Sequence, residues 1–330
     1  MLWCLYAELG VKPWSDDNPA IRFEDEAWDK IIEEARKEGI NTVLLELGEG
    51  VKFASHPELA RAGAWSRSRV RSEVARLKKM GITIIPKMNF SATHHHWLGE
   101  YSRMMSTKIY YRVCREIISE VYELFDKPQY IHLGMDEEGS ETVLRNHDNY
   151  ISYRRGELLW HDFDYLCECV RDTGAIPWVW SDLCFEYPEE FRKRVKNDSV
   201  LLSPWYYFAL KEEHYTVIAD DEEYREYYSQ PPFKYMDLKY VEDEPFNVRF
   251  REQALPAAND GYGLVPCVST WNRIEYNTED TMWYFKTKAP EEAMKGYMTA
   301  PWLSTTMDNV VEIVKGIRLL GEAKRKYYGN

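Results

Sequence analysis

The chain has 330 residues, of which 45% are hydrophobic and 15% aromatic, and its 42 Lys and Arg residues against 55 Asp and Glu residues give a formal net charge of −13. This length and composition predict a globular protein with one large domain or two ordinary ones. The negative charge repels phosphate backbones and anionic lipid, so we expect neither nucleic acid nor a membrane as a partner.

Eight apolar runs along the chain predict strands. In order, they cover residues 2–9, 40–47, 82–88, 129–135, 175–180, 199–205, 264–271 and 297–302. Five of them directly follow a glycine, which supplies the left-handed conformation that ends a helix, and their apolar composition is typical of buried strands. Segments between them, such as 24–38 and 106–125, have the periodicity of helices.

This alternation of strand and helix predicts a mostly parallel sheet. Eight units in this length favour a closed (β/α)8 TIM barrel over an open doubly wound sheet. Because no segment resembles a linker, a low-complexity tract or a second core, we expect a single α/β domain over residues 1–330. The exception to the regular spacing is an acidic, tyrosine-rich insertion, residues 206–245, after the sixth strand. We interpret it as a lid, binding loop or small subdomain, or as a solvated insertion with a short helix.

The N-terminus MLWCLYAELG lacks the features of a secretory signal, and no later segment has about 18 uninterrupted apolar residues. We therefore expect a soluble, cytoplasmic protein from the chain as it stands, and a secreted one if the chain is part of a longer protein. The six cysteines lack the paired spacing of a zinc site, which predicts reduced thiols in the core.

Polar and aromatic residues gather where the predicted strands end, which is where barrels of this kind carry their active sites. In chain order they are Glu8, Glu46, Glu49, Asn89, His94, Asp136, Glu137, Trp180, Asp182, Trp205, Tyr206, Trp271 and Trp302. A single tryptophan at such a position is more often a barrel plug. Four at equivalent positions favour a pocket wall that holds a ring-shaped ligand.

The adjacent carboxylates Asp136 and Glu137 are the strongest chemical signal. Neighbouring residues that leave a strand point in different directions, so the two can contact different atoms of one ligand, one protonated and the other charged. This suits cleavage of a glycosidic bond, which needs a proton donor and a negative charge beside the anomeric carbon. The alternative is an acidic loop that opens the next helix, and we assign Glu138 to that loop.

The run IHLGMDEE resembles the His-x-Gly-Gly-Asp-Glu signature of glycoside hydrolase family 20, the β-N-acetylhexosaminidases, with Met135 in place of the second glycine. VARLKKMGITIIPKMNF and AIPWVWSD are similar to the third-strand and fifth-strand units of that family, and residues 40–60 and YMTAPWLS fit it loosely. The chain departs from the family at Glu8, where an Arg usually ends the first strand, and at Lys87 and Asn89, where the family has acidic residues.

This resemblance implies a glycosidase that removes terminal N-acetylhexosamine, GlcNAc or GalNAc, with retention of configuration. It implies Glu137 as the general acid and Asp136 as the group that orients the 2-acetamido group of the substrate, which attacks the anomeric carbon in place of a protein nucleophile. It also implies a box of three indoles around the acetamido methyl group and a tyrosine after the sixth strand that bonds its carbonyl. The matching residues are Trp180, Trp205 and Trp302 for the box and Tyr206 or Tyr207 for the tyrosine.

Carbohydrate is thus the predicted partner, and we expect neither a cofactor nor a metal ion. Seven further residues are predicted to bind substrate: Glu8, Glu46, Asn89, His94, His132, Asp182 and Trp271. The triple histidine His94–His96 could join His132 and Asp136 around a divalent ion, but successive loop residues diverge and no metallohydrolase signature is present. We therefore expect one histidine in the pocket and two that are solvated or bonded to neighbours.

Two other functions stay open at this point. One is a glycosidase for a sugar without the acetamido group, in which Glu137 works with a second protein carboxylate, Glu46 or Glu8. The other is a catalytically inactive barrel that binds carbohydrate, which the altered loop after the third strand and the missing Arg favour.

Overall fold

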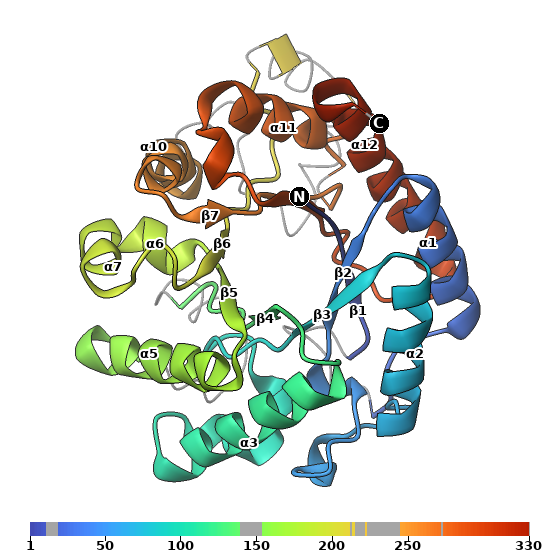
Figure 1. Cartoon of the computed structure of the whole chain (residues 1–330), viewed down its shortest axis with the longest axis vertical. Helices are drawn as coiled ribbons and strands as arrows, with labels where there is room; N and C mark the ends of the chain where they lie inside the picture. The colour runs from blue at the N-terminus through green and yellow to red at the C-terminus, as the bar shows by residue number, and fades with distance from the viewer. Residues whose placement is uncertain are drawn as a thin grey trace.

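The computed structural model describes residues 1–10, 19–138, 154–211, 213–214, 222, 245–271 and 273–329. In this part of the chain, strands and helices alternate, and the strands form a ring inside an outer layer of helices (Figure 1). The predicted α/β TIM-barrel fold is therefore confirmed. Of the predicted insertion 206–245, most lies outside the described residues. No described helix is long and apolar enough to cross a bilayer.

The described sheet contains nine parallel strands in the order β7-β6-β5-β4-β3-β2-β1-β9-β8. They are β1 (Leu2–Glu8), β2 (Thr42–Glu46), β3 (Thr83–Lys87), β4 (Tyr130–His132), β5 (Ile176–Trp180), β6 (Leu201–Ser203), β7 (Gly263–Leu264), β8 (Cys267–Val268) and β9 (Gly296–Thr299). Every predicted strand overlaps an observed one, and the seventh overlaps both β7 and β8. Pro266, which has no N–H for the ladder, lies between these two halves.

The two halves of the seventh strand close the barrel, because their edges have different neighbours. On one side the N–H of Val265 donates to the carbonyl of Leu202 in β6 (2.8 Å). On the other, the N–H of Met298 in β9 donates to the carbonyl of Pro266 (2.9 Å). Since β9 also pairs with β1, hydrogen bonds continue around the whole ring.

Helices on the outside connect the strands. The α-helices are α1 (Asp25–Lys37), α2 (Arg67–Lys79), α3 (Lys108–Leu124), α5 (Gly156–Thr173), α6 (Asp182–Glu186), α7 (Pro188–Arg194), α10 (Pro245–Asn259), α11 (Tyr276–Lys288) and α12 (Val310–Tyr328). Short 3-10 helices are η1 (Gly48–Gly50), η2 (Pro57–Leu59), η3 (His96–Met104), η6 (Glu291–Ala293) and η7 (Met307–Asn309). Apolar residues at helical spacing, such as Trp28, Ile31 and Ile32 of α1, are buried against the sheet.

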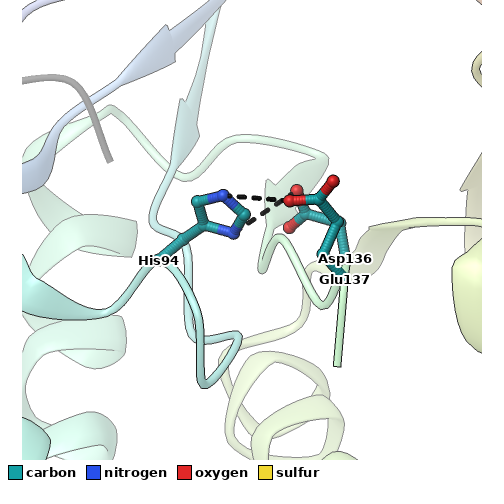
Figure 2. A group of neighbouring side chains, drawn as sticks. All are labelled: His94, Asp136 and Glu137. Atoms are coloured by element: carbon teal, nitrogen blue, oxygen red, sulfur yellow. Dashed lines mark ion pairs between the residues drawn. The ribbon is translucent and has the colours of Figure 1, made fainter. Parts of the chain in front are cut away.

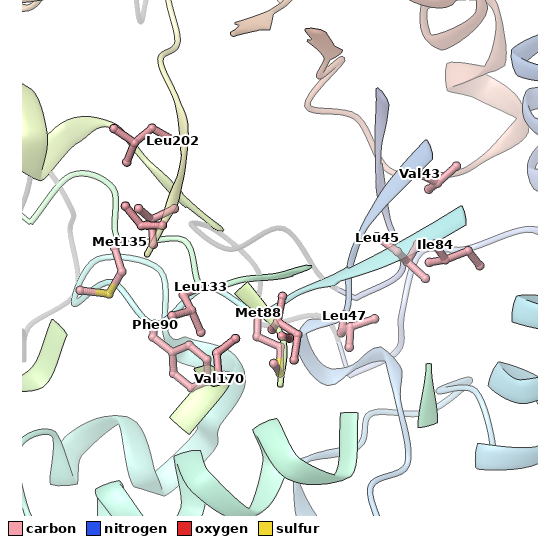
Figure 3. Close-up of a cluster of buried hydrophobic side chains, with 14 of the residues drawn as sticks. Val43, Leu45, Leu47, Ile84, Met88, Phe90, Leu133, Met135, Val170 and Leu202 are labelled. Atoms are coloured by element: carbon pink, nitrogen blue, oxygen red, sulfur yellow. The ribbon is translucent and has the colours of Figure 1, made fainter. Parts of the chain in front are cut away.

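The alternation of side chains along each strand separates an outer core from the barrel interior. Val43 and Leu45 of β2 point outward into the cluster between strands and helices, which Figure 3 shows in part. Leu44 belongs to the interior cluster. Because the period is two, the same alternation turns Glu46 and, on β1, Glu8 toward the interior. The strands therefore deliver polar residues to the inside of the barrel at its carboxyl end.

The expectation that glycines end the helices is correct at three positions and wrong at two. Gly39, Gly81 and Gly174 have φ values of +73°, +80° and +98°. Gly263 and Gly296 instead begin β7 and β9. At Gly296 the reason for glycine is space, since an added Cβ would lie 2.1 Å from the carbonyl oxygen of Leu2.

We predict that Gly134→Ala, just beyond β4, lowers the free energy of unfolding by about 2–5 kcal/mol. Gly134 has a φ of +74°, and an added Cβ would lie 2.0 Å from Oδ1 of Asn89. Gly81→Ala is the matched control, because Gly81 has a φ of +80° and open space around it; it should cost only the left-handed strain, about 1–2 kcal/mol. Urea unfolding measures both, and equal losses would contradict the steric argument.

Candidate active site

The chain leaves β4 through a turn with unusual backbone angles. Gly134, Met135 and Glu137 all have positive φ, at +74°, +67° and +53°. Non-glycine residues are rarely left-handed, and such residues cluster at functional sites. We expected Asp136 and Glu137 to point in different directions, but this backbone turns both side chains toward His94, as Figure 2 shows.

His94 faces the two carboxylates with different ring nitrogens. Nδ1 lies 3.7 Å from Oδ2 of Asp136, and Nε2 lies 3.4 Å from Oε2 of Glu137 (Figure 2). Nδ1 is also within hydrogen-bond distance of the hydroxyls of Thr93 (2.8 Å) and Ser91 (3.0 Å). Burial lowers the pKa of His94, so the ring is neutral at pH 7. With Nδ1 accepting from a hydroxyl, we assign the proton to Nε2, which points at Glu137.

Asp136 is held from the loop that follows β3. Nδ2 of the buried Asn89 donates to its Oδ1 over 2.9 Å. The side chain of Asp136 is 15% exposed and that of Glu137 is 36% exposed. Both carboxylates are therefore fixed by neighbours and still accessible to a ligand.

Asp182, at the start of α6, connects three strand ends. Its Oδ1 accepts from the backbone N–H of Glu137 (3.1 Å) and its Oδ2 accepts from Nε1 of Trp205 (2.8 Å). Burial, together with the negative charge of Asp136, raises the pKa of Asp182 to about 7. The predicted substrate ligand Asp182 thus positions Glu137 and Trp205 in this structure.

Inside the barrel, Glu46 forms an ion pair with Lys87, and both side chains are at most 2% exposed. Nζ of Lys87 lies 5.7 Å from the ring centre of Tyr6 and 5.9 Å from that of Trp180, which places it between opposite walls. Burial raises the pKa of Glu46 while the charge of Lys87 opposes the rise. Glu8, fully buried at the end of β1, is opposite Glu46 in the strand register. These predicted ligands lie in the barrel interior.

The predicted indole box is partly assembled. Trp180 and Trp302 are in contact, with ring centres 5.8 Å apart. Tyr207 lies between Trp205 (5.3 Å) and Trp302 (6.4 Å). Its neighbour Tyr206 turns to the outer core, where its ring stacks on a phenylalanine of α10. Of the two candidate tyrosines, Tyr207 is therefore the one beside the indoles.

Trp271 and His132, two further predicted ligands, lie outside the indole box. Trp271 follows β8 and is 45% exposed at the surface. His132 is fully buried in β4, where its Nδ1 accepts from the N–H of Gly134 (3.0 Å) and its ring lies 4.9 Å from that of Trp180. Burial lowers the pKa of His132 well below its ordinary value. It packs beneath the indole wall as a neutral ring.

In the triple histidine, His94 faces the carboxylates and His96 is exposed, whereas His95 is not solvated as expected. His95 is buried, and burial lowers its pKa to about 3. Among the described residues, His94, Asp136 and Glu137 are also the group that could hold a metal ion, with ligand atoms within 4.8 Å of one another. In the ion pairs of this structure, Asp136 faces Nδ1 of His94 and Glu137 faces Nε2.

Three contributors were missed from the sequence. Ser91 and Thr93 precede His94 by three and one residues, and this spacing of hydroxyls was the available signal. Glu138 was assigned to the acidic loop after β4, and its burial (2% exposed) and its ion pair with Arg154 (2.8 Å) were not foreseen. No local pattern connects residues so far apart in the chain.

The sequence matches no protein-family model and no curated protein sequence. The fold is similar to that of a β-N-acetylhexosaminidase from Bacteroides fragilis NCTC 9343, with a TM-score of 0.59 and 13% identity over 96% of this chain and 65% of that one. It is also similar to a mutant β-hexosaminidase from Streptomyces plicatus in complex with its product GlcNAc (0.62, 13%, 96% and 63%) and to dispersin B (0.59, 11%, 99% and 100%). The chain thus spans less than two thirds of the first two proteins. At these identities the likeness establishes the shared fold.

The raised pKa of Asp182 predicts a specific pH dependence of stability. Between about pH 4, the ordinary aspartate pKa, and pH 7, the unfolded chain has lost this proton while the folded chain keeps it, so stability falls as pH rises. The slope from this group approaches about 1.4 kcal/mol per pH unit. Asp182→Asn should remove it.

Urea unfolding from pH 4 to 8 measures this slope in the wild type and the variant. Asp198→Asn, which changes an exposed aspartate, is the matched control and should leave the slope as in the wild type. An unchanged slope in Asp182→Asn would show that Asp182 is ionised throughout.

Proposed function

We propose that the protein is a retaining glycosidase that removes terminal N-acetylhexosamine by substrate-assisted catalysis. The observation that carries the proposal is the pair Asp136 and Glu137 at the end of β4, both accessible and each facing its own nitrogen of His94. The structural likeness to proteins named β-N-acetylhexosaminidases supports it. Position at the carboxyl end of a barrel strand is also where catalytic residues of such barrels lie.

In the first step, Glu137 gives its proton to the glycosidic oxygen while the acetamido carbonyl oxygen of the substrate attacks the anomeric carbon. The bond from this carbon to the leaving group breaks, and a bond to the carbonyl oxygen replaces it. Asp136 accepts a hydrogen bond from the acetamido N–H and stabilises the positive charge that develops there. The N–H of His94 orients Glu137 for the transfer.

In the second step, water attacks the anomeric carbon on the face that the leaving group vacated. Glu137, now ionised, takes the proton of this water, and the bond to the carbonyl oxygen breaks. Two inversions give overall retention. In this proposal Trp205, Tyr207 and Trp302 hold the acetamido group, because they form the half-buried aromatic wall near Asp136.

The burial of the carboxylates inside the barrel favours this mechanism over one with a protein nucleophile. A retaining two-carboxylate mechanism needs a second carboxylate that reaches the anomeric carbon, about 5–5.5 Å from the acid. Glu46 is the candidate, yet its side chain is 2% exposed and bound to Lys87. Glu8 is fully buried.

We predict that Glu137→Gln lowers kcat on aryl N-acetyl-β-glucosaminides by about 10²–10⁴-fold, with the larger loss for poor leaving groups, since these depend most on the proton donor. Steady-state kinetics on a series of phenols measures it. Glu100→Gln, an exposed change in η3, is the control and should leave kcat unchanged. Equal turnover by Glu137→Gln and the wild type would overturn the assignment of the acid.

We further predict that aryl glucosides without the acetamido group are turned over at least about 10³-fold more slowly, because the internal nucleophile is absent. An N-acetylglucosamine thiazoline, which resembles the cyclic intermediate, should bind the wild type and bind Asp136→Asn more weakly. Calorimetry measures the binding. Equal rates on both substrate classes, with no thiazoline binding, would favour the alternative of two protein carboxylates.

A further inference from the structure

A buried guanidinium lies behind the active site and touches both loops that build it. Arg154, two residues before α5, has a fully buried side chain. The β3 exit loop, residues 88–95, carries Asn89 and His94, and the β4 exit, residues 133–138, carries Asp136 and Glu137. Where β3 and β4 end, the backbone N–H of Phe90 still donates to the carbonyl of Leu133 (2.9 Å). Beyond this point neither loop belongs to a helix or strand, and contacts of side chains hold the two loops together.

Arg154 bonds to the two loops through the same nitrogen. Its Nη2 donates to the carbonyl oxygen of Phe90 in the β3 exit loop (2.5 Å) and to Oε1 of Glu138 in the β4 exit (2.8 Å). Oε1 of Glu138 also accepts from the backbone N–H of Ala92 (3.0 Å). Nη2 further lies 3.9 Å from Sδ of Met135. Arg154 thus contacts residues before and after Glu137 in the sequence, and a residue before His94.

The other end of the guanidinium is anchored to the scaffold. Nη1 donates to Oδ2 of Asp162 in α5 (3.1 Å), a fully buried carboxylate that also accepts from Ser106 (2.6 Å) and Tyr111. The negative charges of Glu138 and Asp162 raise the pKa of Arg154 above its ordinary value against the opposing effect of burial. Arg154 therefore remains charged and is held between Asp162 of α5 and the two loops.

We propose that Arg154 is the positioning residue of this active site: by bonding to Phe90 and Glu138 at once, it sets the separation between His94 and the pair Asp136 and Glu137. The kinetic consequences of this inference rest on the proposed function. Its structural consequence rests on the geometry alone. The left-handed conformations of Met135 and Glu137 give it a physical basis, because backbone of this kind persists only where surrounding contacts determine it.

Arg154→Met keeps the length of the side chain and removes its hydrogen bonds. We expect kcat to fall about 10–100-fold with KM changed less than about threefold, since misplacement by about 1 Å has effects of this size. The loss should grow as the leaving group becomes poorer, because the misplaced group is the proton donor. Arg154→Lys, which can bond to one loop at a time, should recover part of the loss.

Two further variants distinguish destabilisation of the protein from displacement of the catalytic groups. Tyr111→Phe removes a donor to Asp162 without touching either loop, so it should destabilise the protein while leaving kcat and its leaving-group dependence unchanged. Glu138→Gln combined with Arg154→Met removes both charges of the buried pair and should recover stability relative to Arg154→Met alone, yet kcat should stay low. Recovery of kcat together with stability in the double variant would overturn the proposal.

Crystal structures of the wild type and Arg154→Met test the inference without any turnover. The distance between Nε2 of His94 and Oε2 of Glu137, 3.4 Å here, should increase by about 1 Å or more in the variant. An unchanged distance would overturn the positioning role whatever the activity. If the wild type hydrolyses no N-acetylhexosaminide while the distance does increase, the proposed function fails and the positioning role stands.

Discussion

Compensation of buried charge in the barrel mouth determines which carboxylates remain available to a ligand. Glu46 is bound by Lys87 and Glu138 by Arg154, and all four side chains are at most 2% exposed. Such pairs add little net stability, but removal of one partner leaves an uncompensated charge that costs about 3–5 kcal/mol. Asp136 and Glu137 differ because His94 and Asn89, which face their carboxylates, carry no positive charge. The acidic residues at the strand ends are thereby divided into structural and accessible groups.

The backbone at the β4 exit shows why Met135 can occupy the place of a glycine. The position requires a left-handed conformation, which glycine adopts without strain and methionine at a cost of about 1–2 kcal/mol. Met135 compensates by burying its side chain in the outer core (Figure 3). Its sulfur also lies near Arg154. Gly134 has no such freedom, because Asn89 occupies the space where its Cβ would lie. The strictest requirement of this turn thus lies one residue before the substitution.

The fold was predictable because its signals are local and repeated, whereas the details of the site depend on contacts between distant residues. Apolar runs placed all eight strands, and the position of Asp136 and Glu137 after one of them predicted a candidate site. The choice between Tyr206 and Tyr207 could not be made from the sequence. Adjacent side chains point to opposite faces, so one of the two lies in the outer core and the other in the barrel mouth. The ion pair of Glu138 was missed for a related reason: its partner Arg154 is 16 positions away, and no periodicity connects them.

The protonation of Asp182 connects these features to the chemistry that we propose. Two hydrogen bonds, from Glu137 and Trp205, favour its ionised form, while burial and the charge of Asp136 disfavour it, and the result is a pKa of about 7. Below neutrality Asp182 is mostly uncharged, so Asp136 is relieved of a repulsive neighbour when it receives the N–H of the substrate. Above neutrality a second negative charge lies beside Asp136, within the same set of hydrogen bonds that positions the acid. The network that orders the site therefore also makes its electrostatics depend on pH near 7.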